Sequence, residues 1–327
     1  MVLTPEEWVR QNTIQYLVKE LNIPLSLINV EKQIKLHGTI KRYDIVTFNP
    51  DGSIYHLNLK PENISNDLIF VGDPDRVDKV TQHFDTIEFS THKREFKTTT
   101  GTYKNKRISV ISTGIGSDNI DIVLNELDAL VNINLQTRTI KKNHTSLNII
   151  RIGTSGSLQK NIPVDSFLMS TYAIDINGML RSYPTENISH PEIENAFVKH
   201  TQWDEKKSYP LVITNSKLLE SKMNSDIIFK GMTATAGGFY GPQGRVLRIP
   251  LKDSELNHKM NSFIHNNIRV TNYEMETSAI YGLSKLLGHN ACSMNVIIAN
   301  RSTGNFSANP SKAVENLIIY MLNKMTS

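Results

Sequence analysis

Short apolar runs that end at glycine alternate with helical patterns from Ile54 to the end of the chain, and this alternation limits the possible folds most. "DLIFVGDP", "RISVISTGIG" and "LNIIRIG" are three such runs. The second leads into "SDNIDIVLNELDALV", which has apolar residues at helical spacing and Ser117 or Asp118 as a candidate N-cap. Alternating strands and helices predict an α/β domain around a largely buried sheet.

The remaining segments continue the pattern. "SFLMSTYAI" and "KGMTATAGGF" predict strands, "NYEMETSAIYGLSKLLG" a helix, "ACSMNVIIANRS" a central strand and "SKAVENLIIYMLNKM" the closing helix. No internal repeat or low-complexity tract interrupts the series. We therefore expect one large domain over residues 54–327.

Residues 1–53 follow a different pattern. Thr4 is a candidate N-cap, with Pro5 as the first helical residue and Glu7 as the capping-box partner. The alternating runs "INVEKQIKL" and "KRYDIVTF" predict a hairpin, and the Asp-Gly of "NPDGS" predicts a turn before a further strand at "YHLNLKP". A helix and a hairpin are thus expected ahead of the large domain.

Composition and charge exclude several classes of protein. The chain has 327 residues, of which 39% are hydrophobic, and it lacks the run of about 18 apolar residues that spans a bilayer. The amino terminus has neither the basic start nor the apolar core of a secretory signal. The single cysteine, Cys292, lies in an apolar stretch and is expected to be a buried, inert thiol. We expect a cytoplasmic protein without a membrane partner.

The net charge of +4 decides little, because the basic residues are scattered along the chain and do not form a stripe. We therefore expect no nucleic-acid partner.

Arg151 lies inside an apolar strand run, which is expected to end at the Gly-Thr-Ser-Gly that follows. A buried guanidinium stays charged and is costly unless an anion meets it. Gly72 and Arg76 follow another strand, and Arg94 lies in "HKREF". Together with Thr154, these residues offer three guanidinium groups, a hydroxyl and backbone N–H groups, a set that suits a doubly charged oxyanion.

Two alternatives stay open at this point. Arg151 can instead pair with a buried acid such as Glu126. The glycine-rich strand ends, including Gly114 and Gly116 of "STGIGSDN", can be simple tight turns, because none of them matches a dinucleotide fingerprint or a P-loop.

The string "NYEMET" indicates a second kind of chemistry. Glu274 and Glu276 lie two residues apart, so only one of them can point straight into a given pocket, while Met275 offers an apolar wall. A carboxylate that accepts two hydrogen bonds suits a cis-diol. Taken alone, the string is more often part of an ordinary amphipathic helix.

Seven motifs occur in an order that resembles the nucleoside phosphorylase superfamily, and most closely the bacterial uridine phosphorylases: "GDPDRV", "HKREF", "STGIGSDNI", "RIGTSGSLQ", "GFYGPQGR", "TNYEMETSAIYG" and "IANRS". The resemblance implies a three-layer α/β/α fold around a mixed, partly barrel-like sheet. It also implies a pentosyltransferase of nucleoside salvage that converts uridine and phosphate to uracil and ribose 1-phosphate, with no cofactor and no metal.

The resemblance assigns roles to individual residues. Phosphate binding falls to Gly72, Arg76, Arg94, Arg151 and Thr154. Nucleoside binding falls to His56, Phe239, Gln243, Arg245, Glu274, Met275, Glu276 and Arg301. Five of these residues are assigned to catalysis: Arg76, Arg94, Arg151, Arg245 and Glu276. Arg94 and His56 are expected to reach in from a neighbouring subunit, so the resemblance implies a homo-oligomer, a dimer or a hexamer, with shared active sites.

Two positions bear on the choice of base. Arg301 occupies the segment in which purine phosphorylases have a proton-donating Asp, which favours a pyrimidine. The string "GPQGR" departs from the Pro-Gly-Gln-Glu-Arg that is more frequent in the family. The alternatives are a purine or broad-specificity phosphorylase, a hydrolytic nucleosidase, which the phosphate arginines disfavour, and a non-catalytic nucleoside-sensing module.

Residues 1–53 resemble the start of the N-terminal domain of type I restriction endonuclease R subunits, in "TPEEWVRQ", "VEKQIK" and "RYDIV". In that domain an Asp like Asp44 is followed on the next strand by Glu-x-Lys, and these residues hold a metal. Here Lys60 matches the Lys, but Asn58 stands in place of the Glu, and an amide is a poor substitute for a carboxylate ligand of a divalent ion. We expect a truncated nuclease-like remnant without activity.

Overall fold

The computed structural model describes residues 14–20, 29–36, 39–46, 49, 52–135 and 137–327. Residues 14–19 are helical, and β1 (Asn29–Leu36) pairs with β2 (Thr39–Val46) in an antiparallel hairpin. The hairpin predicted from the alternating runs is therefore confirmed. Thr4, Pro5 and Glu7 lie outside the described residues.

The domain is built on one mixed sheet. Its strands are β3 (Asp67–Val71), β4 (Thr86–Lys93), β5 (Phe96–Tyr103), β6 (Lys106–Ser112), β9 (Asn148–Ser157), β10 (Phe167–Asp175), β11 (Leu211–Thr214), β12 (Ile228–Thr235), β13 (Ile264–His265), β14 (Ile268–Glu274), β15 (Asn290–Asn300) and β16 (Asn305–Phe306). The order is β13-β14-β12-β10-β15-β9-β3-β6-β5-β4, with β11 on β10 and β16 on β15. A short separate pair joins β7 (Ile133–Asn134) to β8 (Thr139–Ile140).

One extra pairing curls half of this sheet. The end of β14 pairs with β9 through Asn272 with Ser157 and Tyr273 with Gly156. Strands β9, β15, β10, β12 and β14 therefore follow one another in a ring, while β3, β6, β5 and β4 extend from β9 as an open wing. The prediction of a mixed, partly barrel-like sheet is confirmed.

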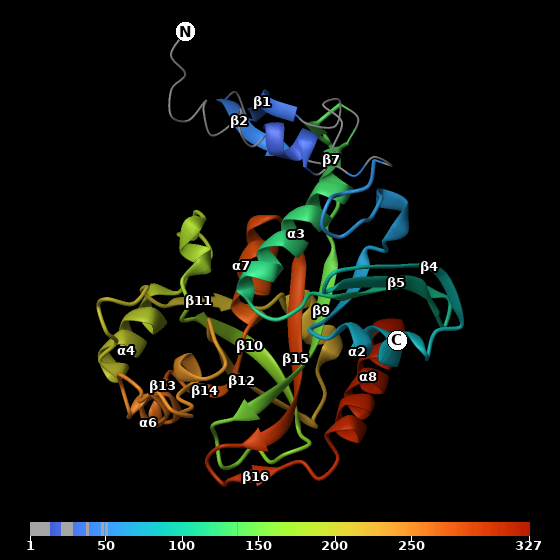
Figure 1. Ribbon diagram of the computed structural model, residues 1–327. Coiled ribbons are helices and arrows are strands. Elements are labelled where there is room, and N and C mark those ends of the chain that lie inside the picture. Colours follow the sequence, from blue (N-terminus) through green and yellow to red (C-terminus); the bar gives the residue numbers. More distant parts are fainter. Residues whose placement is uncertain (1–13, 21–28, 37–38, 47–48, 50–51, 136) are drawn as a thin grey trace.

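Helices cover both faces of the sheet (Figure 1). They are α2 (Pro74–Thr81), α3 (Ser117–Asn132), α4 (Pro191–Thr201), α5 (Lys217–Met223), α6 (Leu256–Ser262), α7 (Thr277–Leu286) and α8 (Pro310–Thr326), with 3₁₀ turns at Pro61–Asn63, Met179–Ser182 and Gly241–Gln243. Ile149 of β9 packs in one core with α3 and α7, whereas Ile150 and Ile152 pack in another with α2 and α8. The alternation of side chains along β9 thus joins the two helical layers, as the α/β/α prediction requires.

Three predicted boundaries were wrong. Strand β9 does not end at Gly153 but runs to Ser157, because β15 pairs with it along its whole length and β14 joins at its end. The helix predicted from Asn272 begins at Thr277, since Asn272–Glu274 belong to β14. Helix α3 begins after Gly116, whose φ of 101° places it as the N-cap, and neither Ser117 nor Asp118 caps the helix with its side chain.

The strand predicted at "YHLNLKP" is a turn. Asn58 has a φ of 55°, and its backbone N–H donates to the carbonyl of Ile54. Its side-chain oxygen accepts hydrogen bonds from Asn49 and Ser53 at 3.0 and 3.1 Å, so the amide is used to close this turn. The side chain of Asp44 lies outside the described part of the chain.

Within the described residues, no helix is both long enough and apolar enough to cross a membrane. Cys292 is fully buried on β15, and burial raises the pKa of its thiol to about 12, as expected for an inert cysteine.

Candidate active site

A cavity of about 1110 Å³ opens where several strands of the sheet end. It lies beside the ends of β3, β9, β14 and β15, and the loop around the 3₁₀ turn Gly241–Gln243 closes its far side. Eleven of the residues proposed from sequence line it: Gly72, Arg76, Arg151, Thr154, Phe239, Gln243, Arg245, Glu274, Met275, Glu276 and Arg301. Motifs more than two hundred residues apart in sequence therefore meet at one site.

Arg151 lies at the inner wall of this cavity and is 7% exposed. Its Nη1 donates to Asn295 Oδ1 at 3.0 Å, and its Nη2 pairs with the carboxylate of Glu276 and lies 3.4 Å from Glu274 Oε2. Burial alone disfavours the guanidinium charge, but the two carboxylates outweigh this and raise the pKa of Arg151. The prediction that Arg151 pairs with a buried acid is thus confirmed, but the acids are Glu276 and Glu274 and not Glu126.

Gly153 makes room for this guanidinium. A Cβ added at Gly153 would lie 1.8 Å from Arg151 Nη1 and 2.5 Å from Asn295 Oδ1. Any side chain at this position would occupy the slot that the guanidinium fills. Gly153 of "RIGTSG" is therefore required because a side chain there would clash with Arg151, and not because the chain turns.

The two glutamates of "NYEMET" have different tasks. Glu274 accepts the backbone N–H groups of Glu276 and Thr277, both at 2.8 Å, and the hydroxyl of Thr235 at 2.6 Å, so it fixes the turn from β14 into α7. Glu276 accepts from the backbone N–H of Gly116 at 2.9 Å and from Arg151. Both carboxylates line the cavity and face Arg151 Nη2, whereas only one of them was expected to point into the pocket.

The carboxyl of Glu276 is electrostatically perturbed. It is 5% exposed, and this burial raises the pKa of its carboxyl, with Arg151 opposing the shift and Glu274 adding to it. Titratable groups perturbed in this way, and lining a cavity, are typical of functional sites.

Arg76 supplies a second guanidinium at the same end of the cavity. Its Nη1 lies 3.4 Å from the carbonyl oxygen of Ile152, and burial together with the nearby charge of Arg151 lowers the pKa of Arg76. Thr154 and Gly72 line the same region. Two like charges held close together in a half-buried setting favour an anion between them.

The other end of the cavity is aromatic and rich in hydrogen-bond donors. Gln243 Oε1 accepts from Arg245 Nη1 at 2.7 Å and from Arg301 Nη2 at 2.9 Å. The Arg245 guanidinium lies 3.8 Å from the centre of the Phe239 ring, and the Arg301 guanidinium lies 4.8 Å from that of Tyr273. Burial and the charge of Arg245 lower the pKa of Arg301 to about 10. This end suits a flat, carbonyl-bearing ring.

His56 and Arg94 do not line the cavity. Arg94 lies exposed between β4 and β5, with a φ of 57°. His56 Nδ1 lies 2.6 Å from Glu126 Oε1, and the Glu126 carboxylate also accepts the backbone N–H groups of His56 and Leu57. Within one subunit, these two residues are separate from the rest of the predicted set.

Sequence reasoning missed three residues of the site. Gly153 leaves space for the Arg151 guanidinium, and Asn295 and Tyr273 contact Arg151 and Arg301. Gly116 was a candidate from sequence, but its hydrogen bond to Glu276 was not predicted. Asn295 offers a faint signal as a polar residue within the apolar run "SMNVII". Its partner could not be identified without the pairing of β15 with β9.

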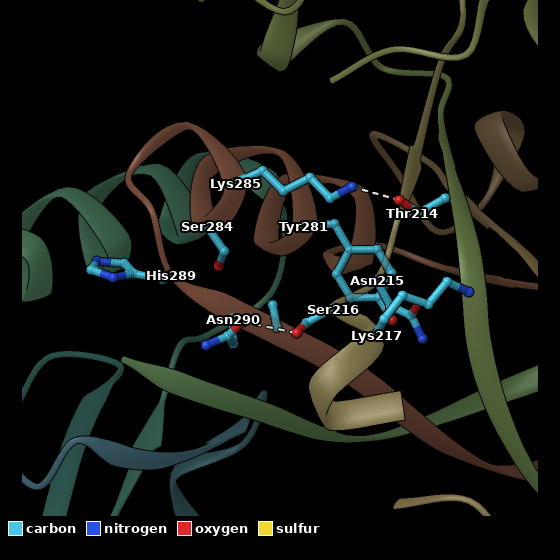
Figure 2. Close-up of a pocket in the computed structure, with 10 residues that line it drawn as sticks. Thr214, Asn215, Ser216, Lys217, Tyr281, Ser284, Lys285, His289 and Asn290 are labelled. Carbon is cyan, nitrogen blue, oxygen red and sulfur yellow. Dashed lines mark hydrogen bonds between the residues drawn. The ribbon is translucent and has the colours of Figure 1, made fainter. Parts of the chain in front are cut away.

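A smaller cavity of about 310 Å³ lies elsewhere, between α7, the start of α5 and the start of β15 (Figure 2). Figure 2 shows Lys285 donating to Thr214 and Ser216 donating to Asn290. Lys285 occupies the last turn of α7, where a cation complements the free carbonyl groups of the helix, so its charge has a structural reason. None of the residues proposed from sequence lines this cavity.

His289, at the rim of the smaller cavity, belongs to a cluster with His144 and Asp128. The backbone N–H of Leu147 donates to His289 Nδ1 at 3.2 Å, so the ring proton of a neutral His289 lies on Nε2, which faces Asp128 Oδ1 at 3.3 Å. A metal-bound imidazole normally donates from its other nitrogen, whereas here that nitrogen accepts. The cluster is therefore a polar contact between α3 and the residue that precedes β15, and His289 Nε2 makes no hydrogen bond within the described residues.

Comparisons with known proteins agree with this arrangement. The chain is 29% identical to the uridine phosphorylase of Thermococcus kodakarensis over 78% of this chain and 80% of that protein. It is 26% identical to a DeoD-type purine nucleoside phosphorylase of Bacillus thuringiensis, over 76% of this chain and 88% of that protein.

A solved structure, a Trypanosoma brucei nucleoside phosphorylase whose description states uridine phosphorylase activity, superposes with a TM-score of 0.77 at 28% identity. The match covers 86% of this chain and 99% of that one. Residues 5–67 match the family described as the type I restriction enzyme R protein N terminus. Residues 67–322 match the family model of the phosphorylase superfamily, and the chain belongs to this superfamily.

Proposed function

We propose that this chain is a uridine phosphorylase that converts uridine and phosphate to uracil and ribose 1-phosphate. The observation that carries the proposal is the division of the cavity into an end with two mutually repelling arginines, Arg76 and Arg151, and an end with Gln243 and Arg245. The names of two relatives, a uridine phosphorylase and a nucleoside phosphorylase with uridine phosphorylase activity, support the same reaction.

Phosphate is proposed to bind to Arg76, Arg151 and Thr154, with Arg94 of a neighbouring subunit completing the site. One phosphate oxygen attacks C1′ of the ribose and forms the new C–O bond. The C1′–N1 bond breaks, and uracil leaves with the bonding electron pair as an anion, which takes a proton afterwards. Placement and charge stabilisation by the arginines carry this reaction, and phosphate acts as a co-substrate without a further cofactor.

Glu276 is proposed to accept hydrogen bonds from the ribose hydroxyls, beside the apolar wall of Met275. Arg245 and the amide of Gln243 are proposed to meet the carbonyl oxygens of the leaving uracil. Both Arg245 and Arg301 donate to Gln243 Oε1, so the amide nitrogen is the group left to donate to a base. Phe239 supplies a ring against which the base can stack.

A pyrimidine fits this end of the cavity better than a purine. A leaving purine gains from an acid that protonates its ring, but the residue that follows β15 is Arg301, whose guanidinium donates to Gln243 and Asn257. Uracil has two carbonyl oxygens and so suits a donor-rich pocket. Because a DeoD-type purine phosphorylase is also a relative, purine phosphorolysis is the second candidate.

The active unit is proposed to be a homo-oligomer, because His56 and Arg94 lie away from the cavity of their own subunit. The segment 1–53 is proposed to be a nuclease-like remnant without catalytic function, joined to a phosphorylase domain that begins at residue 54.

A phosphate-dependence assay tests the proposal. Purified protein is incubated with uridine or inosine, with and without phosphate, and the free base is quantified. Uracil released only in the presence of phosphate is the expected result. Faster release from inosine selects the purine enzyme, release without phosphate selects a nucleosidase, and nucleoside binding without turnover selects a sensing module.

A further inference from the structure

Asn295 lies at the centre of the sheet, directly beside the proposed phosphate site. It is fully buried on β15 and pairs in parallel register with Gly153 of β9. Because Gly153 has no side chain, the Arg151 guanidinium fills the space above this pair, and its Nη1 donates to Asn295 Oδ1 at 3.0 Å. Asn295 thus contacts the guanidinium from the neighbouring strand, in the space that Gly153 leaves free.

The partners of Arg151 differ in charge. Its Nη2 faces two carboxylates, those of Glu276 and Glu274, whereas its Nη1 faces the neutral amide oxygen of Asn295. A buried N–H without an acceptor is costly, so this donor needs a partner. A third carboxylate would satisfy it equally well but would add negative charge beside the place where a phosphate dianion must bind.

A charge count shows why the difference matters. Arg76 and Arg151 bring two positive charges to this end of the cavity, and Glu274 and Glu276 bring up to two negative charges. The neutral acceptor at residue 295 leaves this balance unchanged. An acidic residue there would make the balance negative before any phosphate arrived.

We propose that Asn295 is a positioning residue that fixes the Arg151 guanidinium for phosphate without neutralising it. This inference rests on the proposed function, because it takes phosphate as the ligand of Arg151. It assigns Asn295 a role in affinity for the anion and none in recognition of the nucleoside.

The test compares Asn295→Ala, which removes the acceptor, with Asn295→Asp, which replaces it by a carboxylate of the same size. We expect the KM for phosphate to rise about tenfold in Asn295→Ala and further in Asn295→Asp, the size of effect typical of a lost charged hydrogen bond. The KM for uridine should stay within about twofold, since these contacts face phosphate and not the nucleoside.

Asn132→Ala is the matched control. Asn132 is 5% exposed on α3, donates to Asp128 and Thr145, and does not line the cavity. Its loss should lower the melting temperature without changing the KM for phosphate. A purely structural Asn295 would behave in the same way.

An unchanged phosphate KM in Asn295→Ala, or an equal rise in both KM values, would overturn the inference. Asn295→Ala alone is decisive if Asn295→Asp does not fold. Phosphate binding measured by calorimetry separates the two proposals. If the native protein binds phosphate but turns over no nucleoside, the proposed function fails, while weaker phosphate binding by Asn295→Ala still supports the role of Asn295.

Discussion

Arg151 is permanently charged and buried, and negative, neutral and positive groups lie around it. Two carboxylates, an amide oxygen and a second guanidinium lie around it, and the glycine two residues later leaves it space. The sequence indicated that an anion or an acid must lie nearby. The structure provides the acids, Glu276 and Glu274, and places Arg151 in the lining of the cavity, where we propose that an anion binds.

Replacing Arg151 by alanine should lower turnover by the equivalent of about 2–4 kcal/mol, the usual cost of losing a preorganised charged donor. Steady-state kinetics with varied phosphate would show this loss in kcat/KM for phosphate. A variant that keeps the native rate and phosphate dependence would disprove the anion site.

The raised pKa of Glu276 predicts a pH dependence of the reaction. Because burial favours its protonated form, this carboxyl takes up a proton at a higher pH than an ordinary glutamate does. A protonated carboxyl is a poorer acceptor for ribose hydroxyls, so kcat/KM for uridine should fall on acidification at a pH above the usual glutamate range. Glu276→Gln should lose activity and also lose this acidic limb; a limb that persists in Glu276→Gln belongs to another group.

At the scale of the elements, apolar periodicity predicted the strands and helices of the domain, because each buries one face or both. It failed to predict the boundaries of strands that pair with strands far away in the sequence. Strand β9 continues past Gly153 because β15 and β14 pair with it, and Asn272 is drawn into β14 by its neighbours β12 and β9. No local pattern contains these partners. For the same reason, the residues that line the cavity could be predicted from motifs, but Asn295 and the contact of Gly116 with Glu276 could not.

Gly153→Ala should disable the site through strand β9 alone. The new Cβ would displace the Arg151 guanidinium, which is 1.8 Å away, while all charged residues stay present. We expect a loss of kcat/KM for phosphate comparable to that of Arg151→Ala. Gly156→Ala in the same strand is the control, because a Cβ there approaches Arg301 no closer than 3.5 Å. Equal losses of kcat/KM in the two variants would show that the space above Gly153 is not specifically required to position Arg151.

At the scale of the whole molecule, the placement of His56 and Arg94 outside the cavity predicts shared sites between subunits. Mixing inactive Arg94→Ala with inactive Glu276→Ala should restore part of the activity, because one intact pocket can form from two differently damaged chains, provided that subunits exchange. Light scattering should find at least a dimer. A monomer that phosphorolyses uridine at the full rate would exclude this model.

The segment ahead of the domain predicts a further result. Deleting residues 1–48, which keeps Asn49 and Ser53 as partners of Asn58, should leave uridine phosphorolysis unchanged. The full chain should not cut DNA in the presence of magnesium, because Asn58 closes a turn and offers no carboxylate. Gel electrophoresis of treated DNA and the uracil assay give the two readouts. Cleavage that disappears in Asp44→Ala would contradict the reading of this segment as a remnant.

The Glu126 carboxylate on α3 holds the start of the domain in place. By accepting the backbone N–H groups of His56 and Leu57 together with the His56 ring, it ties the first residues of the domain to α3, whatever precedes them. A gene fusion upstream of this anchor leaves the geometry of His56 intact. We therefore expect the position of His56 to depend on Glu126 more than on the residues that precede the domain.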